Sequence, residues 1–318
     1  MASAPSSPGP AAGAVPGPAW WRLEMACPPE LEDSLLWKLP ELGIVRIALR
    51  HRPEAPAERQ LLAWLPEVDW PEAERRELER ALQPLGEPFQ LELTPIHWKR
   101  QPDEDWSLSW KQHWQPDPVG QRLLILPAWL ELPAEHGDRL VIRMDPGSAF
   151  GTGSHPTTRL CLEALEASPP VGLRVADLGC GSGVLGLAAL RLGAASVAAA
   201  DTDPLAERAT RTNAALNGDG VSERMVVAQG SVEQLAELLE GRPADLLLCN
   251  ILAPVIEALC PAFSTVLAPA GTGYLSGLLV DQAPGLIQAL AAQGWQAELT
   301  AQQDRWGLLT IRRRGNVA

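Results

Sequence analysis

The stretch Val175-Ala-Asp-Leu-Gly-Cys-Gly-Ser-Gly183 decides the fold of this chain. The apolar residues from Leu173 to Ala176 predict a buried parallel strand, and the glycines let the backbone turn sharply into a helix predicted over Val184 to Leu192. The next apolar segment, Ser196 to Ala200, is followed by Asp201. An acid in this position hydrogen-bonds the ribose hydroxyls in doubly wound nucleotide folds, so the pattern predicts a nucleotide-type cofactor site.

The kind of nucleotide depends on an acid that precedes the glycines. Read from its second glycine, the loop Gly181-Ser-Gly-Val-Leu-Gly186 also fits the dinucleotide fingerprint. Asp177, at the tip of the first strand, would repel a pyrophosphate but would suit the ammonium group of S-adenosylmethionine. The residues therefore favour S-adenosylmethionine over a dinucleotide. The remaining alternative is that the glycines only form a tight turn between strand and helix.

Strand-like and helix-like segments alternate from Gly120 onward, which is typical of an open parallel sheet with helices on both faces. The segments predicted after the glycine loop are, in order, the strand Ser196 to Asp201, the helix Pro204 to Asn217, the strand Arg224 to Ala228, the helix Ser231 to Leu239, the strand Asp245 to Asn250, the helix Pro254 to Leu267, the strand Gly271 to Ser276, the helix Asp281 to Gln293, and a terminal pair of strands, Trp295 to Thr300 and Leu308 to Arg312. The sequence thus predicts an α/β fold with a seven-stranded sheet.

The residues before this sheet differ in composition. Residues 1–18 are rich in Ala, Pro, Gly and Ser and carry no charge, which predicts a disordered tail rather than a signal peptide or an anchor. Residues 19–98 predict a smaller N-terminal α/β domain, residues 99–119 a helical linker, and residues 120–318 the large domain. The elements expected in the small domain are the strands Trp21 to Ala26, Ile44 to Leu49 and Phe89 to Ile96 and the helices Glu30 to Leu39 and Glu72 to Leu82.

The linker carries Trp106, Trp110 and Trp114 at four-residue spacing, so the three indoles would share one stripe on a helix. The stripe is either an aromatic binding surface or the packed face of a linker helix. Apolar stripes usually mean burial, which favours the second interpretation. The same interpretation applies to three other tryptophans, Trp20, Trp21 and Trp98.

The composition indicates a soluble globular protein. The 318 residues, 46% of them hydrophobic, are sufficient for packed cores, and no apolar run approaches the span of a bilayer. The net charge of −13 disfavours direct nucleic-acid binding and favours a basic partner, although acidity can serve solubility alone. The cysteines lack metal-binding or redox spacing, which predicts reduced thiols in the cytoplasm and no metal site. They are Cys27, Cys161, Cys180, Cys249 and Cys260.

A glycine-punctuated loop, Met144-Asp-Pro-Gly-Ser-Ala-Phe-Gly-Thr-Gly-Ser-His-Pro-Thr-Thr158, runs into a helix that should begin near Pro156. Thr157 and Thr158 would place hydroxyls and free backbone donors where a cofactor carboxylate could lie. The loop is either a lid or an inert connection, and long glycine loops are more often functional. His155 is more often a cap or a packed side chain than a general base at such a position, so it receives no catalytic role.

A second segment, Leu246 to Pro254, brings Asn250 to the carboxyl edge of the fourth strand, beside the glycine loop. Its amide offers one acceptor and two donors. It could therefore hold a target nitrogen in line with the sulfonium methyl, or fix the cofactor itself. The alternative is a turn asparagine that merely ends a strand, but its place after a hydrophobic run favours the site.

Taken together, these residues resemble the PrmA family, the methyltransferases that modify large-subunit ribosomal protein number eleven. The resemblance covers roughly Asp105 to Arg313. It implies the seven-stranded class I methyltransferase (Rossmann-like) sheet with S-adenosyl-L-methionine as methyl donor. Ser154 stands where threonine is usual, which keeps the hydroxyl. The motifs that carry the resemblance are Asp145-Pro-Gly, Phe150-Gly-Thr-Gly-Ser-His-Pro-Thr-Thr158, Asp177-Leu-Gly-Cys-Gly-Ser-Gly183 and Asn250-Ile-Leu-Ala253.

The resemblance also implies which residues contact the cofactor. In the family they are the last threonine of the lid motif, the first glycine of the loop, the acid that ends the second strand and the asparagine of the fourth strand. In this sequence they are Thr158, Gly179, Asp201 and Asn250. Asn250 is in addition the residue expected to act in catalysis.

The implied reaction is direct in-line methyl transfer to amines of a basic ribosomal protein, with lysine side chains and the amino terminus as acceptors. The small domain would recognise that protein. We expect a monomeric, cytoplasmic enzyme without a direct nucleic-acid or membrane partner.

Two other kinds of function stay open at this point. One is methyl transfer to a small-molecule amine or to a glutamine amide, although the glutamine and adenine enzymes typically continue Pro-Pro-Tyr where this chain has Ile251-Leu-Ala. The other is a non-catalytic protein that binds S-adenosylmethionine.

Overall fold

The computed structural model describes residues 20–44, 46–52, 55–101, 114–145 and 153–314. The chain forms two compact units. The smaller unit comprises Met1–Cys27 and Arg46–His113, and the larger unit comprises Pro28–Val45 and Trp114–Ala318. Helix α1 (Pro29–Glu41) therefore belongs to the larger unit, although the strands on either side of it in sequence belong to the smaller one.

The smaller unit is built on a four-stranded antiparallel sheet in the order β2-β3-β1-β4. Its elements are β1 (Trp20–Ala26), β2 (Ile47–Arg52), β3 (Ala55–Pro66), α2 (Glu72–Leu82), a 3-10 helix (Gln83–Phe89) and β4 (His97–Gln101). Leu23 on β1 and Leu78 on α2 are buried in it. The Arg75 guanidinium carbon lies 3.8 Å from the ring centroid of Trp21, and the Trp98 indole donates to Glu79 over 2.7 Å. These contacts are those of packed side chains.

The 12-residue strand β3 of the smaller unit was not predicted at all. One predicted strand of this unit is wrong, because no strand covers Phe89–Ile96. The alternating apolar residues there are typical of a strand, but the chain folds back instead: the Leu91 N–H donates to the Gly86 carbonyl over 3.0 Å. A side chain at Gly86 would meet that same Leu91 backbone, so the close approach depends on glycine. The tryptophans Trp106 and Trp110 of the predicted linker stripe lie outside the described residues, and the stripe stays a prediction.

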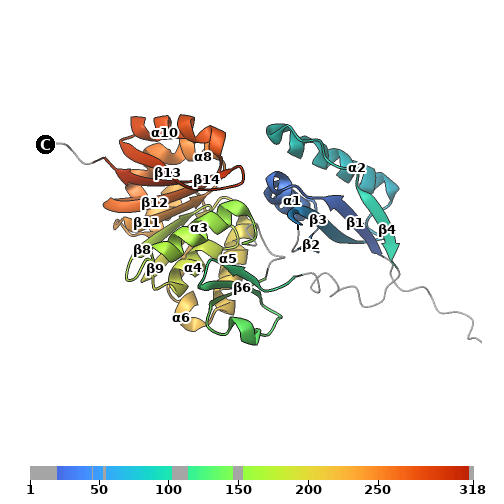
Figure 1. Cartoon of the computed structure of the whole chain (residues 1–318), viewed down its shortest axis with the longest axis horizontal. Coiled ribbons are helices and arrows are strands. Elements are labelled where there is room, and N and C mark those ends of the chain that lie inside the picture. Colours follow the sequence, from blue (N-terminus) through green and yellow to red (C-terminus); the bar gives the residue numbers. More distant parts are fainter. Residues whose placement is uncertain (1–19, 45, 53–54, 102–113, 146–152, 315–318) are drawn as a thin grey trace, which may run out of the picture. The chain divides into compact units, whose positions relative to one another are not determined.

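The larger unit contains a seven-stranded sheet in the order β10-β9-β8-β11-β12-β14-β13 (Figure 1). The first five strands are parallel, and β14 runs antiparallel to both of its neighbours. This sheet confirms the predicted fold class. Its strands are β8 (Arg174–Leu178), β9 (Ser196–Asp201), β10 (Met225–Gln229), β11 (Ala244–Asn250), β12 (Leu267–Leu279), β13 (Trp295–Gln303) and β14 (Trp306–Arg313).

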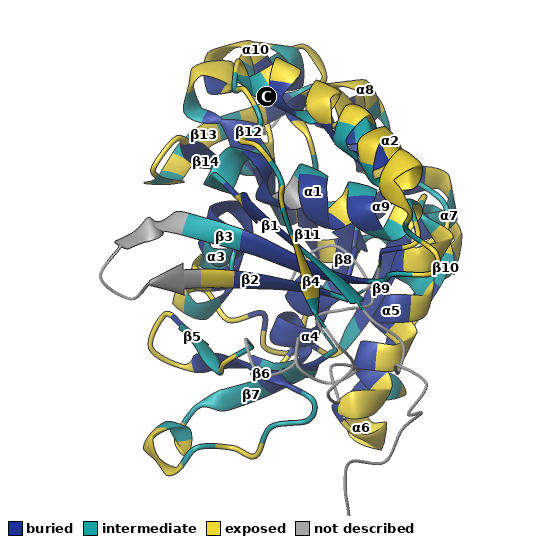
Figure 2. Ribbon diagram, turned by 90° about the vertical axis from the view of Figure 1, so that its right-hand side faces the viewer, coloured by how far each residue is buried: buried dark blue, intermediate teal, exposed yellow. Residues whose placement is uncertain are grey.

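Helices cover both faces of this sheet. On one face lie α3 (Pro156–Ala167), α4 (Val184–Arg191) and α5 (Pro204–Leu216), followed by the short α6 (Asp219–Ser222). On the other face lie α7 (Val232–Leu238), α8 (Ala253–Leu259), α9 (Phe263–Val266) and α10 (Ala283–Ala292). Apolar residues of this second set, including Phe263 and Leu286, form one core with Ala176 and Leu178 of β8. Figure 2 shows the buried residues along the strands and the exposed ones on the outer turns of the helices.

The single helix predicted over Pro254 to Leu267 is wrong. The structure divides it into α8, a 3-10 turn (Cys260–Ala262) and α9. Pro261 lies at the break, and a proline has no N–H to continue a helix. A further small sheet was also unexpected. It contains β5 (Asp117–Val119), β6 (Leu123–Pro127) and β7 (Leu140–Met144) in the order β5-β6-β7.

Candidate active site

Three neighbouring strands of the large sheet end at the same edge. Ala200 of β9 and Cys249 of β11 both pair with Leu178 of β8. Asp201 and Asn250 therefore follow on either side of the glycine loop, which begins directly after Leu178. Ligands bind outside the carboxyl ends of the strands in open α/β sheets, so these residues share the expected position for a ligand.

The glycine loop is shaped by its main chain. Gly179 has a φ of +75°, and its N–H donates to the Ala200 carbonyl over 2.8 Å. A Cβ atom at this position would lie 2.3 Å from Cγ2 of Ile251, the residue after Asn250. Glycine is thus required at 179 both by the backbone conformation and by the close approach of the fourth strand's loop.

Asp201 is fixed by two backbone donors. Its Oδ2 accepts from the Gly181 N–H over 2.9 Å, and its Oδ1 accepts from the Asp203 N–H over 3.0 Å. Burial raises the pKa of Asp201, and these two hydrogen bonds oppose the rise. Each carboxylate oxygen has a second lone pair for a ligand hydroxyl. The arrangement fixes the Asp201 carboxylate against the glycine loop.

Asp177 lies differently from our expectation. We expected its carboxylate to face the ligand's ammonium group directly, but the side chain is only 1% exposed. Its Oδ2 accepts from the Gly186 N–H of α4 over 3.0 Å, and its Oδ1 is buried without a hydrogen-bond partner among the described residues. Burial raises the pKa of Asp177 to about 7, and the nearby Asp201 adds to the rise. Asp177 therefore lies buried beneath the glycine loop, where its ionised form would act on a ligand through its charge rather than by contact.

Asn250 and Thr158 come together although they are far apart in sequence. The Asn250 Nδ2 donates to the Thr158 Oγ1 over 3.2 Å. Thr158 lies in the first turn of α3 and is buried. His155 is the N-cap of this helix, where its ring accepts from the Thr157 N–H, and it is 2% exposed. The expectation that His155 is a capping and packed residue is confirmed.

Three polar residues of α5 and its C-cap support this edge and were not predicted from the sequence. Thr210 donates to the Gly181 carbonyl over 2.9 Å. Asn213 donates to the Ser182 carbonyl over 2.9 Å and accepts from the Asp145 N–H over 2.9 Å. Asn217, which caps the end of α5, exchanges hydrogen bonds with the main chain of β7. Their spacing of three and four residues places them on one helix face, which is a signal that could have identified them.

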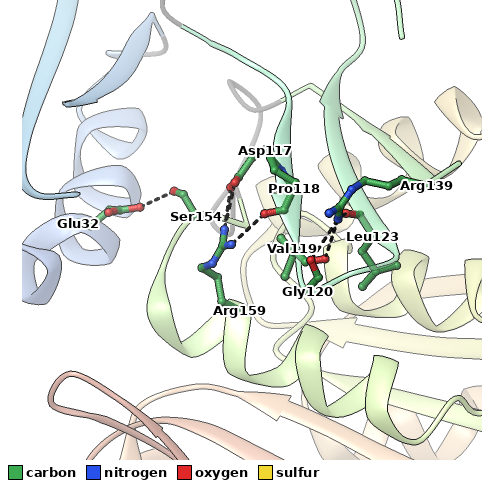
Figure 3. Close-up of polar contacts among 9 residues, drawn as sticks. All are labelled: Glu32, Asp117, Pro118, Val119, Gly120, Leu123, Arg139, Ser154 and Arg159. Atoms are coloured by element: carbon green, nitrogen blue, oxygen red, sulfur yellow. Dashed lines mark hydrogen bonds and ion pairs between the residues drawn. The ribbon is translucent and has the colours of Figure 1, made fainter. Parts of the chain in front are cut away.

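The start of α3 is attached to the small sheet as well. Arg159 of α3 contacts the carboxylate of Asp117 at 3.0 Å and donates to the Pro118 carbonyl over 2.9 Å (Figure 3). Arg139 donates to main-chain carbonyls between the end of β5 and the start of β6, including the Leu123 carbonyl at 2.8 Å. The helix that carries Thr158 is thereby held by β5 in addition to the contact with Asn250.

The charges at this edge select among ligands. Among the described residues, neither Asp177 nor Asp201 forms an ion pair with a lysine or arginine. Two carboxylates without a cation repel a pyrophosphate and attract a positively charged group. The residues thus fit S-adenosylmethionine, which has a sulfonium, an ammonium and a ribose diol.

No cluster of three or more His, Cys, Asp or Glu side chains suited to a metal ion occurs in the described part of the chain. That part also has no helix of the length and apolar content that a membrane crossing requires.

Known proteins match this chain along most of its length. Residues 19–314 match the family model described as ribosomal protein L11 methyltransferase (PrmA). A protein of that name from Parasynechococcus marenigrum (strain WH8102) is 68% identical over 91% of this chain and 100% of its own length. One from Synechococcus sp. (strain RCC307) is 64% identical over 93% of this chain and 98% of its own length.

A solved structure agrees with these sequence matches. The crystal structure of ribosomal protein L11 methylase from Lactobacillus delbrueckii subsp. bulgaricus superposes with a TM-score of 0.56 at 34% identity. The match covers 64% of this chain and 100% of that one. The chain therefore belongs to the PrmA family of ribosomal protein L11 methyltransferases.

Proposed function

We infer that the protein is a methyltransferase that uses S-adenosyl-L-methionine to methylate lysine amines of ribosomal protein L11. Family membership supports the reaction class. The observation that carries the proposal in the structure is the contact between Asn250 and Thr158 beside the glycine loop. When bound there, S-adenosylmethionine supplies an electrophilic methyl group on its sulfonium.

Asn250 is proposed to orient the acceptor amine. Its Nδ2 is engaged by Thr158, and its Oδ1 can accept from an amine N–H. An amine held in this way points its lone pair in a fixed direction. Orientation of two reacting groups can contribute a large part of a rate enhancement.

The acceptor must be neutral before it reacts. A lysine ammonium has a reference pKa of about 10.4, and partial desolvation favours the neutral form. His155 does not supply a general base, because its ring nitrogens face the Pro29 carbonyl and Thr157. We propose that proton loss to solvent precedes positioning by Asn250.

The other predicted residues receive cofactor-binding roles in this proposal. Asp201 would accept from the ribose hydroxyls with the lone pairs that the loop N–H groups leave available. Gly179 would allow the main chain to approach the ligand closely, and Thr158 would complete the pocket from α3.

The wider setting is also proposed. The net charge of −13 suits capture of a basic protein in the cytoplasm without direct nucleic-acid or membrane contact. A monomeric enzyme is proposed as well.

The test is methyl transfer from labelled S-adenosylmethionine to purified ribosomal protein L11, with the modified residues identified by mass spectrometry. Wild type should label lysines. Asn250→Ala should lose about 100-fold or more in kcat, the effect of a lost positioning group. Gln296→Ala removes an exposed amide on the edge strand β13 and should match wild type.

Three results would redirect the proposal. Labelling of small-molecule amines but not of L11 would identify a different acceptor. Binding of S-adenosylmethionine without any transfer, in a complete ribosomal protein extract, would indicate a non-catalytic factor. Full activity of Asn250→Ala would remove Asn250 from the mechanism.

A further inference from the structure

Helix α1 is fastened to the residues that introduce α3. The Ser154 hydroxyl donates to the Glu32 Oε1 over 2.8 Å, and Glu32 is fully buried (Figure 3). The next residue, His155, hydrogen-bonds the Pro29 carbonyl with its Nε2 over 2.9 Å. Arg305, in the turn between β13 and β14, contacts Glu30 at 3.4 Å. The first turn of α1 thus has three polar attachments within the larger unit.

The hydrogen bonds of the two ring nitrogens of His155 determine its tautomer. The Pro29 carbonyl can only accept, so Nε2 carries the proton. In the neutral ring, Nδ1 is then an acceptor, as its contacts with the Thr157 N–H at 3.2 Å and the Thr157 hydroxyl at 2.7 Å require. The ring also packs edge-on against Trp306, with centroids 4.8 Å apart. One imidazole therefore bonds α1 on one side and caps α3 on the other.

This cap lies directly beside the candidate active site. Thr158 follows Thr157 in the first turn of α3 and accepts from Asn250. The contacts run without a gap from Pro29 through His155 and the first turn of α3 to Asn250. Asp201, the glycine loop and Asn250 lie at one edge of the large sheet, which we call the cofactor edge. A shift of the His155 ring would move Thr157 and Thr158, which support this edge.

We propose that His155 is a positioning residue, which fastens α1 to α3 and so fixes the geometry of Thr158 and Asn250. The chain leaves the smaller unit after Cys27, forms α1, and returns to the smaller unit at Arg46. His155 thus connects the cofactor edge to α1, which in the chain follows a strand of the smaller unit and precedes another. Ligand binding at that edge therefore stabilises α1, and a stable α1 in turn favours ligand binding. This inference rests on the proposed function, because it takes S-adenosylmethionine as the ligand.

Two substitutions separate the two contacts of the ring. His155→Asn places an acceptor near the Nδ1 position and keeps the cap, since asparagine is a favoured N-cap residue, but it is too short to reach Pro29. His155→Gln places a donor near the Nε2 position and keeps the reach to Pro29, but it weakens the cap. His155→Ala loses both contacts.

The measurement is amide hydrogen exchange with and without S-adenosylhomocysteine, together with kcat and the KM for S-adenosylmethionine. In wild type, the ligand should slow exchange in the glycine loop, in α3 and also in α1. In His155→Asn, the slowing should persist in the glycine loop and α3 but disappear from α1, and kcat should fall about tenfold with a smaller change in KM. His155→Gln should keep the slowing in α1, and its weaker cap on α3 should lower kcat more than it raises KM.

Equal slowing of α1 in wild type and His155→Asn would overturn the proposal, as would a wild-type α1 that does not respond to the ligand. Should His155→Asn not fold, Glu32→Ala tests the neighbouring attachment, with Glu32→Gln as its matched control because the amide oxygen still accepts from Ser154. Loss of the α1 response in Glu32→Ala and its retention in Glu32→Gln support the proposal, and identical responses contradict it. If the ligand slows exchange nowhere, the proposed function itself fails.

Discussion

The two sides of the cofactor edge are held by different kinds of contact. On one side, Gly179 and Asp201 are fixed almost entirely by backbone N–H and carbonyl groups. On the other side, Asn250 is fixed by the side chain of Thr158, which depends on α3 and its cap. From this difference we propose a division of labour, in which the backbone-held side would set cofactor affinity and the side-chain-held side would set the rate of transfer.

The largest effect on the backbone-held side is expected from Gly179→Ala. The added Cβ meets Ile251 at 2.3 Å in a left-handed backbone conformation, which together cost about 2–4 kcal/mol. S-adenosylhomocysteine binding should be lost, as calorimetry can show. Gly172→Ala is the matched control, because its φ of +73° is nearly the same but nothing lies within 4 Å of the new Cβ. It should cost only about 1–2 kcal/mol and retain binding. Equal losses in both variants would contradict the role of the Ile251 contact.

The next largest effect is expected from Asn213, a buried residue of α5 that hydrogen-bonds the glycine loop. Asn213→Ala removes the hydrogen bond that the buried amide donates to the Ser182 carbonyl and the one that it accepts from the Asp145 N–H. This should lower the free energy of unfolding by about 2–3 kcal/mol. Denaturant unfolding measures this loss. Thr212→Ala, one residue away on the exposed face of the same helix, should change it by less than about 0.5 kcal/mol. A similar cost for both would show that Asn213 is not a structural link.

The smallest effect is a pH dependence caused by Asp177. Its folded-state pKa of about 7 exceeds the reference value of 3.8, so the folded protein holds this proton more tightly than the unfolded chain does. The resulting stability is complete below about pH 4 and is lost as the pH rises through about 7. Between about pH 6 and about pH 8 the loss is on the order of 1 kcal/mol. Thermal unfolding without ligand should show this slope in wild type, and Asp177→Asn should reduce it. An unchanged slope would assign the titration to another group.

The same comparison explains what the sequence could reveal. The glycine loop, its flanking strands and the acid that ends β9 are encoded in consecutive residues, so local patterns predicted them. Asn250 was predicted because it comes at the end of a hydrophobic run that is the fourth strand predicted in the alternating segments after Gly120. The contact with Thr158 required the helix α3 to be placed against a residue 92 positions further along the chain, and no sequence pattern predicted it.

Other features have no local signal. Asn213 looks like an ordinary polar helix residue until the fold brings Ser182 and Asp145 to it. Helix α1 belongs to the larger unit and contacts it through residues far apart in sequence, such as Glu32 and Ser154, which are 122 residues apart. The segment Phe89–Ile96 alternates like a strand, but the tight approach of Gly86 to Leu91 prevents its extension.

The most direct test of the division of labour is the dissociation constant of S-adenosylhomocysteine, measured by calorimetry for wild type, Asp201→Ala and Asn250→Ala. Asp201→Ala should weaken binding by about 10- to 100-fold, because hydrogen bonds to a charged group are lost. Asn250→Ala should weaken it by no more than about tenfold, the value of one neutral hydrogen bond. A loss of affinity in Asn250→Ala that equals or exceeds that in Asp201→Ala would contradict the account.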